Sequence, residues 1–406
     1  MSPQPDSRYA VMRLAVALVL MAVGASGMYV VAVVLPAVQA EFGVARADAS
    51  MPYTWMLVGF GLGGIVMGKL ADRYGVTVPI LISAAGLGLG YAVAGVAGDI
   101  WLFSIAHGVL IGLLGASATF APLIADTTLW FVRRRGIAVA VCASGNYLAG
   151  AVWPPIVQHF VETVGWRDTY LGLAAVSSIV MLSLAPLLRQ RPPLPQPAKG
   201  APAGAAAAAP SRPFGLSPFA ATVLLCLAGL ACCVAMSMPQ VHIVAYCGDL
   251  GYGAARGAEM LSLMLGFGIV SRLASGAICD RIGGLRTLLL GSALQGAALL
   301  LFLPFDGLAS LYVISALFGL FQGGIVPSYA IIVREHFSPR EAGSRTGTVL
   351  MFTLLGMALG GWMSGKVFDL TGSYDAAFIN GIAWNLLNLA IATALLLRVR
   401  RRLAAA

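Results

Sequence analysis

Twelve charge-poor segments of membrane-spanning length dominate this sequence. A helix that crosses the hydrocarbon core of a bilayer needs roughly 20 mostly apolar residues. The segments run approximately over residues 14–40, 49–68, 74–98, 100–125, 136–161, 169–188, 213–248, 260–279, 287–305, 307–333, 346–365 and 376–397. Their length and lack of charge predict an all-α integral membrane protein with twelve transmembrane helices.

Composition agrees with a membrane protein and gives no sign of an enzyme. Of the 406 residues, 59% are hydrophobic and 10% are charged, whereas soluble domains have about 25% charged residues. The 49 glycines suit helices that approach closely in lipid. The first apolar run, Leu14–Ala40, is too long for a signal-peptide core, so we expect no cleaved leader. The aqueous loops are too short to house catalytic machinery.

The six cysteines show no metal-ligand spacing and lie mostly within the apolar segments, so we interpret them as free packing residues. They are Cys142, Cys226, Cys232, Cys233, Cys247 and Cys279. We therefore expect neither a metal site nor a cofactor.

Positive charge is distributed by topology rather than gathered into a nucleic-acid footprint. The formal net charge is +9. If the N-terminus is cytoplasmic, only four of the 25 basic residues fall in outer loops, and these are Arg46, Arg167, Arg256 and Lys366. The positive-inside rule then predicts that both termini are cytoplasmic. We expect a monomeric, multi-pass protein of a bacterial inner (plasma) membrane. Its expected surroundings are the lipid bilayer, and we expect no nucleic-acid partner.

A proline-rich stretch divides the twelve segments into two sets of six. Gln190–Pro213 contains seven prolines, an alanine-rich patch and no apolar period, as is typical of a flexible or extended linker. The predicted domains are an N-terminal bundle over residues 1–188, a cytoplasmic linker over 189–215 and a C-terminal bundle over 216–406.

The two halves also repeat each other in sequence. Gly63–Gly75 aligns with Ser271–Gly283 at an offset of 208. In this alignment Gly68, Asp72, Arg73 and Gly75 match Gly276, Asp280, Arg281 and Gly283. At an offset of 211, Arg134, Gly136, Gly145 and Gly150 match Arg345, Gly347, Gly356 and Gly361. Such half-chain repeats are how transporters build alternating access around a site near the midplane.

Arg272 is the only basic residue that the sequence places inside a membrane segment. It lies in Met260–Cys279, which has no other charge, and aligns with Gly64 in the repeat. A charge at this depth costs at least about 2.5–3.5 kcal/mol and usually faces a cavity or pathway. The other interpretation is a structural arginine that snorkels or pairs with an acid, but no acidic residue lies at a comparable depth. Because a guanidinium fork matches a carboxylate, we predict a buried site for a small organic anion.

The segment Gly68-Lys69-Leu70-Ala71-Asp72-Arg73-Tyr74-Gly75 resembles the signature loop of the major facilitator superfamily. The second copy at Gly276–Gly283 strengthens the resemblance, which implies two pseudo-symmetric six-helix bundles. In this family the loop holds one conformation closed through carboxylate contacts with a helix N-terminus. The resemblance thus implies gating roles for Gly68, Asp72, Arg73, Gly75, Asp280 and Arg281.

Two further features resemble the monocarboxylate transporters and their oxalate–formate exchanger relatives. They are Trp130–Ala138, continued through Gly145 to Gly150, and Arg272 itself. The resemblance implies that lactate, pyruvate or a similar acid binds Arg272, commonly together with a proton. Where mammalian members carry an aspartate and a lysine, this chain has Gly268 and Leu35-Pro36-Ala37. The family's proton-coupling groups are therefore not carried over.

The superfamily fold also suggests which helices surround the path, namely the first, fourth, seventh and tenth. On the tenth, Gln322 and Tyr329 are seven residues apart and would share a face. Phe120 in the fourth helix and Asn146 in the fifth complete the predicted substrate contacts. Each of the four is interpreted equally well as an interhelical hydrogen bond or as plain packing.

Because no acidic residue lies within the membrane segments, two histidines are the candidates for a role in proton coupling. His107 and His242 are the remaining mid-chain groups that titrate near neutral pH, although a lone membrane histidine is more often a packing residue. Asn385 and Asn388 are interpreted as interhelical glue.

The function predicted from these features is proton-coupled symport of small monocarboxylates by alternating access. One alternative is an organic-anion exchanger of the oxalate–formate type, but Thr346–Gly365 carries no charge and so favours a monoanion. A multidrug efflux pump is the other alternative, and pumps for cations usually place an acid in the membrane.

Overall fold

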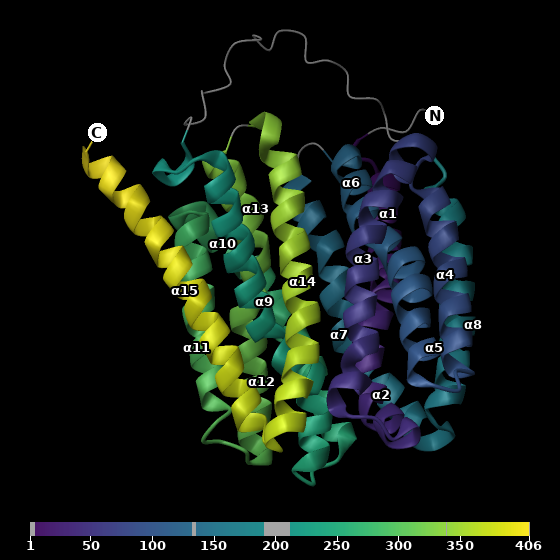
Figure 1. Cartoon of the computed structure of the whole chain (residues 1–406). Coiled ribbons are helices and arrows are strands. Elements are labelled where there is room, and N and C mark those ends of the chain that lie inside the picture. The colour runs from purple at the N-terminus through teal and green to yellow at the C-terminus, as the bar shows by residue number, and fades with distance from the viewer. Residues whose placement is uncertain (1–4, 132–134, 191–211, 338, 406) are drawn as a thin grey trace. The chain divides into compact units, whose positions relative to one another are not determined.

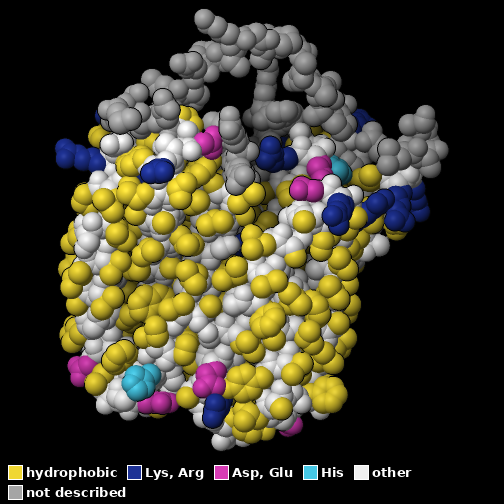
Figure 2. All heavy atoms as spheres, turned by 180° about the vertical axis from the view of Figure 1, so that it is seen from behind, with side chains coloured by type: hydrophobic (Ala, Val, Ile, Leu, Met, Phe, Trp, Pro, Cys, Tyr) yellow, Lys and Arg dark blue, Asp and Glu magenta, His cyan; other side chains and the backbone are white. Residues whose placement is uncertain are grey.

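The structure is a computed structural model that describes residues 5–131, 135–190, 212–337 and 339–405. Twelve helical stretches of these residues are long and apolar enough to cross a membrane, which confirms the predicted all-α membrane fold. Hydrophobic side chains cover the middle of the face seen in Figure 2, and charged side chains gather toward its two ends.

The helices before residue 190 form the first six spans (Figure 1). Their elements are α1 (Arg8–Gly24), α2 (Ser26–Phe42), α3 (Arg46–Tyr74), α4 (Thr77–Gly95), α5 (Ile100–Ile105), η1 (Ala106–Gly115), η2 (Ala116–Thr119), α6 (Ala121–Trp130), α7 (Arg135–Val164), α8 (Trp166–Leu184) and η3 (Ala185–Leu188).

The helices after residue 212 form the other six spans. Their elements are η4 (Pro213–Gly215), α9 (Pro218–Asp249), α10 (Ala254–Ile282), α11 (Gly284–Leu301), α12 (Leu308–Gln322), α13 (Ile325–His336), α14 (Pro339–Thr371) and α15 (Tyr374–Ala405). The predicted linker falls mainly on residues 191–211, which lie outside the described part of the chain.

The chain divides into two compact units. The first is made of Met1–Pro195 with Gln240–Gly266, and the second of Gln196–Pro239 with Phe267–Ala406. Both changes of unit occur inside a helix, after Pro239 of α9 and after Gly266 of α10. A proline removes one backbone hydrogen bond from a helix interior, so α9 changes unit where its hydrogen-bond ladder is interrupted.

The segment Gln240–Gly266 is held in the first unit by polar contacts. Arg46 at the start of α3 forms an ion pair with Asp249, with a nitrogen–oxygen distance of 3.2 Å. The hydroxyl of Ser262 donates to the carbonyl of Ala151 in α7. These contacts tie the ends of α9 and α10 to the N-terminal helices.

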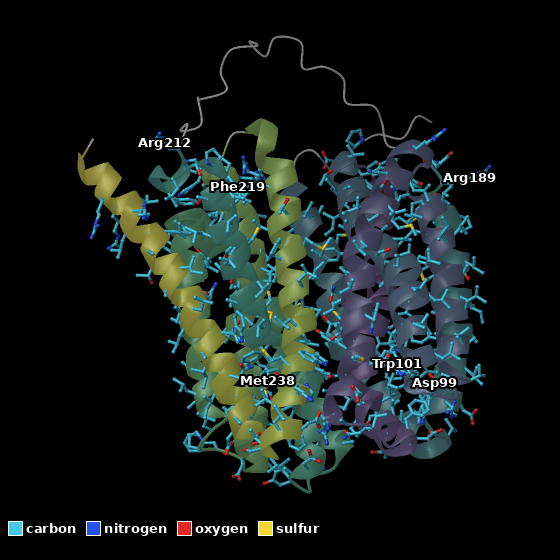
Figure 3. The ribbon with its side chains drawn as sticks, in the orientation of Figure 1. Asp99, Trp101, Arg189, Arg212, Phe219 and Met238 are labelled. Carbon is cyan, nitrogen blue, oxygen red and sulfur yellow. The ribbon has the colours of Figure 1, made fainter. Side chains whose placement is uncertain are left out.

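Side-chain and glycine caps set several helix ends. Asp99 precedes α5, and its carboxylate accepts hydrogen bonds from the amides of Trp101 at 2.8 Å and Leu102 at 2.9 Å (Figure 3). Such a cap satisfies amides that have no partner within the helix. Gly75 ends α3 with φ +84°, and Gly283 ends α10 with φ +83°. Only glycine enters this region of backbone space without strain, so the repeated glycines have the same conformational role.

The fourth span departs from the plain helix that the sequence predicts. It runs from α5 through the π-helix η1 and the short 3-10 helix η2 into α6. Neighbouring backbone packs against this span at its glycines: a β-carbon on Gly112 would clash with the carbonyl oxygen of Met56 in α3. Local π and 3-10 geometry often marks functional segments of helices. Tertiary contact, which no local pattern reports, therefore shapes this span.

Candidate functional site

Arg272 lies in the interior of α10, in the part that belongs to the second unit. Its side chain is half-buried, and its Nε atom is shielded from solvent. The described structure thus keeps the guanidinium within a membrane span rather than at a helix end. An ionisable residue within a membrane span is a candidate for a substrate or ion pathway.

The surface of α10 beside Arg272 packs against an interruption in the tenth span. Helix α12 ends at Gln322 and α13 begins at Ile325, with Gly323 and Gly324 between them. A β-carbon on Gly323 would lie 2.8 Å from the β-carbon of Ser271, and one on Gly324 would clash with the side chain of Ser275. Only glycine allows α10 to approach so closely. Discontinuous helices form binding sites in many transporters, but both glycines here keep right-handed helical angles.

The interruption also places Gln322 near Arg272 along the packed surfaces. Gln322 precedes Gly323, Arg272 follows Ser271, and Ser271 and Gly323 are in close contact. The side chain of Gln322 is fully buried. The two predicted contacts are therefore sequence neighbours of the residues that pack α10 on the tenth span.

Tyr329 lies elsewhere in the second unit. The tenth span passes from α12 to α13 between Gln322 and Tyr329, and both intervening glycines keep right-handed helical angles. Tyr329 is fully buried in an apolar cluster with Leu225 and Ala392. Its hydroxyl accepts a hydrogen bond from the amide of Asn388 at 2.7 Å. Tyr329 was predicted as a substrate contact, with an interhelical hydrogen bond or plain packing as the alternatives. This geometry favours the interhelical hydrogen bond.

The two asparagines of α15 join neighbouring helices. The amide nitrogen of Asn388 also donates to the carbonyl of Ala228 in α9 at 2.8 Å. That of Asn385 donates to the carbonyl of Ser292 in α11 at 3.0 Å. Both bonds cross between helices, which confirms the predicted role of these asparagines.

The counterpart of Arg272 in the repeat has room for a side chain. Gly63 of α3, which aligns with Ser271, packs against the fourth span, and its β-carbon would lie 2.7 Å from that of Ser117. A β-carbon on the next residue, Gly64, would meet no atom within 4 Å. The packing of α3 on the fourth span therefore repeats that of α10 on the tenth. The two copies share this packing, and Arg272 differs from its counterpart Gly64 by carrying a charged side chain.

Phe120 occupies the bend between η2 and α6 in the first unit. Its backbone angles, φ −108° and ψ −83°, lie outside the helical range. Its ring is half-buried and lies 5.9 Å from the ring of Phe60 in α3. The bend thus turns an aromatic side chain out of the regular helix.

Asn146 of α7 is paired with Tyr29, which is not among the predicted substrate contacts. The hydroxyl of Tyr29 in α2 donates to Oδ1 of Asn146 at 2.6 Å. Tyr29 is 5% exposed, whereas Asn146 is half-buried. The spacing of Asn146 and Gly150, one helical turn apart, was the available signal for a close approach at this face of α7.

The last turn of α1 links the surroundings of Phe120 and Asn146. A β-carbon on Gly24 would lie 2.5 Å from that of Thr119, the residue before Phe120. A β-carbon on Gly145, the residue before Asn146, would lie 2.8 Å from that of Met21. The residues that precede both predicted contacts therefore pack on one turn of α1, beside the junction with α2.

The two histidines with a predicted proton role are fully buried. In His107, Nδ1 lies 2.9 Å from the carbonyl oxygen of Phe103 and Nε2 lies 3.1 Å from the hydroxyl of Tyr170. A carbonyl can only accept, so Nδ1 carries the proton and Nε2 accepts from Tyr170. Both nitrogens are thus engaged when the ring is neutral. His242 lies in α9, in the part assigned to the first unit.

The signature loops are repeated in backbone geometry. Both end in a glycine of positive φ whose amide donates to a carbonyl four residues earlier, at 2.8 Å in each case. A β-carbon on Gly68 would meet no atom within 4 Å. The side chain of Asp72 lies outside the described part, and Arg73 is exposed, with its guanidinium 5.2 Å from the ring centre of Tyr74. In the second copy, Asp280 and Arg281 are both exposed.

A different acid reaches a helix N-terminus beside the second loop. Both carboxylate oxygens of Glu335, at the end of α13, lie 3.1 Å from the amide nitrogen of Gly284, the first residue of α11. A negative charge is favourable there, because the helix dipole leaves partial positive charge at that end. The family resemblance implies such a contact for Asp280, and no local pattern in the sequence points to Glu335.

A buried ion pair lies at the end of the fourth span that is far from Asp99. Arg13 of α1 bonds to Asp126 of α6 at 2.6 Å, and the two side chains are 3% and 12% exposed. The guanidinium also lies 4.6 Å from the ring centre of Trp130. The pair links the first span to the fourth. Among the described residues, no cluster of three or more His, Cys, Asp or Glu could hold a metal ion.

Comparison with known proteins gives one family and several relatives. The sequence matches the family described as Major Facilitator Superfamily over residues 16–310 and 260–405. Monocarboxylate transporter 13 of Bos taurus is 27% identical over 345 residues, covering 84% of this chain and 79% of the relative. MFS-type transporter opdF of Penicillium oxalicum is 26% identical over 352 residues, covering 82% and 77%.

Solved structures of transporters share the fold. A bacterial homologue of the human lysosomal transporter Spinster, inward-facing and occupied, superposes with a TM-score of 0.72 at 14% identity, covering 97% of this chain and 98% of that one. The peptide transporter POT in complex with sulfate gives a TM-score of 0.75 at 13% identity, covering 98% and 97%.

Proposed function

Because the chain belongs to the Major Facilitator Superfamily and is therefore a multi-pass membrane transporter rather than an enzyme, we propose that its substrates are small monocarboxylates such as L-lactate or pyruvate. The observation that carries the proposal is Arg272, a permanently charged group in the interior of α10. The names of two relatives, monocarboxylate transporter 13 and monocarboxylate transporter 4, support this substrate class.

The chemistry of the guanidinium supports a carboxylate as its ligand. Its planar fork offers two parallel N–H donors to the two oxygens of a carboxylate. The resulting pair has no net charge, whereas the empty site keeps a full positive charge. Closing the protein around an unneutralised charge is costly in a low-dielectric interior. The loaded carrier therefore changes conformation more readily than the empty one.

Four further residues are proposed as substrate contacts, and each is considered within its own unit. In the second unit, Gln322 lies at the junction where α10 meets the interrupted tenth span. In the first unit, Asn146 offers an amide and Phe120 an aromatic surface, which suits an acid with a short apolar tail. Tyr329 stays a predicted contact, although its bond to Asn388 favours a structural role.

Transport is proposed to be proton symport, with His107 and His242 as the candidate proton-linked groups. Anion exchange is the second candidate, because an empty site with a lone cation disfavours return of the unloaded carrier. In either case the uncharged run Thr346–Gly365 of α14 favours a monoanion. The loop residues Gly68, Asp72, Arg73, Gly75, Asp280 and Arg281 are proposed to gate the cycle. The carrier is proposed to work as a monomer in a bacterial inner membrane, with both termini cytoplasmic.

Uptake of labelled lactate into liposomes that contain the purified protein tests the substrate proposal. Arg272→Ala should abolish uptake, and Arg272→Lys should restore it poorly because lysine lacks the fork. Arg256→Gln is the matched control, since Arg256 lies on the same helix, where it is paired with Glu259. Wild-type uptake in Arg272→Ala would refute the role of Arg272.

The same liposomes distinguish symport from exchange. An imposed inward proton gradient should drive accumulation of lactate against its concentration if the protein is a symporter. Accumulation that requires an internal carboxylate and ignores the proton gradient would establish exchange instead.

A further inference from the structure

Tyr29 and Asn146 form a buried hydrogen-bonded pair within the first unit. The phenol of Tyr29 is 5% exposed and donates to Oδ1 of Asn146 at 2.6 Å. The Asn146 side chain accepts this bond through its carbonyl oxygen and is itself half-buried. The pair joins α2 to α7 beside the junction of α1 and α2.

Glycine at position 150 allows the phenol to reach this place. Gly150 lies one turn after Asn146 on α7, and its β-carbon would lie 2.9 Å from two atoms of the Tyr29 ring. Side chains four residues apart share a helix face. The ring therefore rests on the backbone of α7 while its hydroxyl reaches the amide one turn earlier.

This contact determines what the amide presents. An asparagine side chain has one carbonyl acceptor and one NH₂ group with two donors. The Tyr29 hydroxyl occupies the carbonyl side, so the NH₂ group is the part left to meet a ligand. Donors without an acceptor match an oxygen atom of a substrate and do not match a hydrocarbon chain.

We propose that Tyr29 is a positioning residue that orients Asn146 so that its NH₂ group binds the oxygen on carbon 2 of a 2-oxo or 2-hydroxy monocarboxylate. The inference rests on the proposed function and narrows it to a substrate class. Pyruvate and lactate carry this oxygen, whereas propionate has the same carbon chain without it. A buried donor that loses its acceptor is penalised, so propionate binds more weakly than pyruvate.

The experiment measures kcat/KM for uptake of pyruvate and of propionate into liposomes and compares their ratio between variants. Tyr29→Phe keeps the ring on Gly150 but releases the amide, so the ratio should fall about tenfold, as expected for one hydrogen bond to substrate. The fall should appear mainly as a higher KM for pyruvate. Tyr91→Phe is the matched control, because Tyr91 is a buried tyrosine of the same unit whose hydroxyl lies 2.6 Å from that of Ser26.

A second variant tests whether Tyr29 acts through Asn146. Asn146→Leu should lower the ratio by at least as much, and adding Tyr29→Phe to it should cause no further fall. An unchanged ratio in Tyr29→Phe, an equal fall in Tyr91→Phe or additive falls in the double variant would each overturn the proposal. Failure of the wild type to carry any monocarboxylate would refute the proposed function, whereas uptake with an unaltered ratio would refute this inference alone.

Discussion

The carboxylate of Glu335 caps the N-terminus of α11 by accepting the amide hydrogen of Gly284, with both oxygens 3.1 Å from the nitrogen. Glu335 lies in α13, and Gly284 is the first residue of α11, the helix that follows the second signature loop. The contact is of the kind that the family resemblance implied for the loop aspartates, but it is made by a different acid. It joins the tenth span to the ninth within one unit.

Replacing Glu335 by glutamine should weaken this junction. Glutamine keeps an acceptor but loses the negative charge, and a charge at a helix N-terminus contributes about 0.3–1 kcal/mol. The midpoint of thermal unfolding in detergent should fall slightly and become less sensitive to salt. Asp280→Asn, which alters the exposed loop acid, should leave the midpoint unchanged. An equal fall in both variants would contradict this assignment.

The close contact between Gly324 and Ser275 should make position 324 intolerant of a side chain. Gly324→Ala places a methyl group against the Ser275 side chain, and overpacking of this kind costs about 1–3 kcal/mol. Thermal unfolding should show the loss, and Gly324→Ala combined with Ser275→Gly should recover part of it. Gly276→Ala is the control, since its methyl group meets no neighbour within 4 Å.

The buried pair of Arg13 and Asp126 should be important for the stability of the first unit. Asp126→Asn leaves the Arg13 charge buried without a counter-ion, and breaking such a pair costs about 3–5 kcal/mol. Denaturation in detergent should show a large loss of stability for Asp126→Asn. Glu259→Gln removes the exposed partner of Arg256, where a surface pair contributes about 0–1 kcal/mol. Similar losses in both variants would show that burial of the Arg13 pair is unimportant.

Tyr329→Phe separates the two interpretations of this tyrosine. If its hydroxyl serves only Asn388, KM for lactate should not change, while stability should fall by about 1–3 kcal/mol because one N–H of the buried Asn388 amide loses its acceptor. A several-fold rise in KM with unchanged stability would instead make Tyr329 a substrate contact.

The adjacent glycines 63 and 64 should respond in opposite ways to alanine. Gly63→Ala would clash with the carbonyl of Leu113 and with Ser117, whereas Gly64→Ala enters open space. Expression and thermal unfolding should show a severe effect for the first variant and almost none for the second. Equal tolerance would mean that α3 does not pack on the fourth span as described.

Sequence patterns were sufficient for the spans, the half-chain repeat and the unusual position of Arg272, because each depends on local hydrophobicity or on identity between the halves. They were insufficient where backbone shape depends on a neighbouring helix. The break between α12 and α13 at Gly323 and Gly324 is an example, because the glycine pairs Gly63-Gly64 and Gly360-Gly361 lie within regular helix.

Partners far apart in sequence were missed for the same reason. Tyr29 and Asn146 are separated by more than a hundred residues, and Glu335 meets Gly284 across two helices. Neither contact leaves a periodic trace. A glycine one turn from a polar residue, as at Gly150 and Asn146, was the only hint available.

The empty space at Gly64 has a consequence for how this scaffold diversifies. Packing between helices uses Gly63 and Ser271, while the next positions, 64 and 272, are left to differ without disturbing that packing. One nucleotide change converts a glycine codon GGN into an arginine codon CGN. A single mutation is thus enough to place a guanidinium at the first copy of this position without disturbing the packing of α3 on the fourth span.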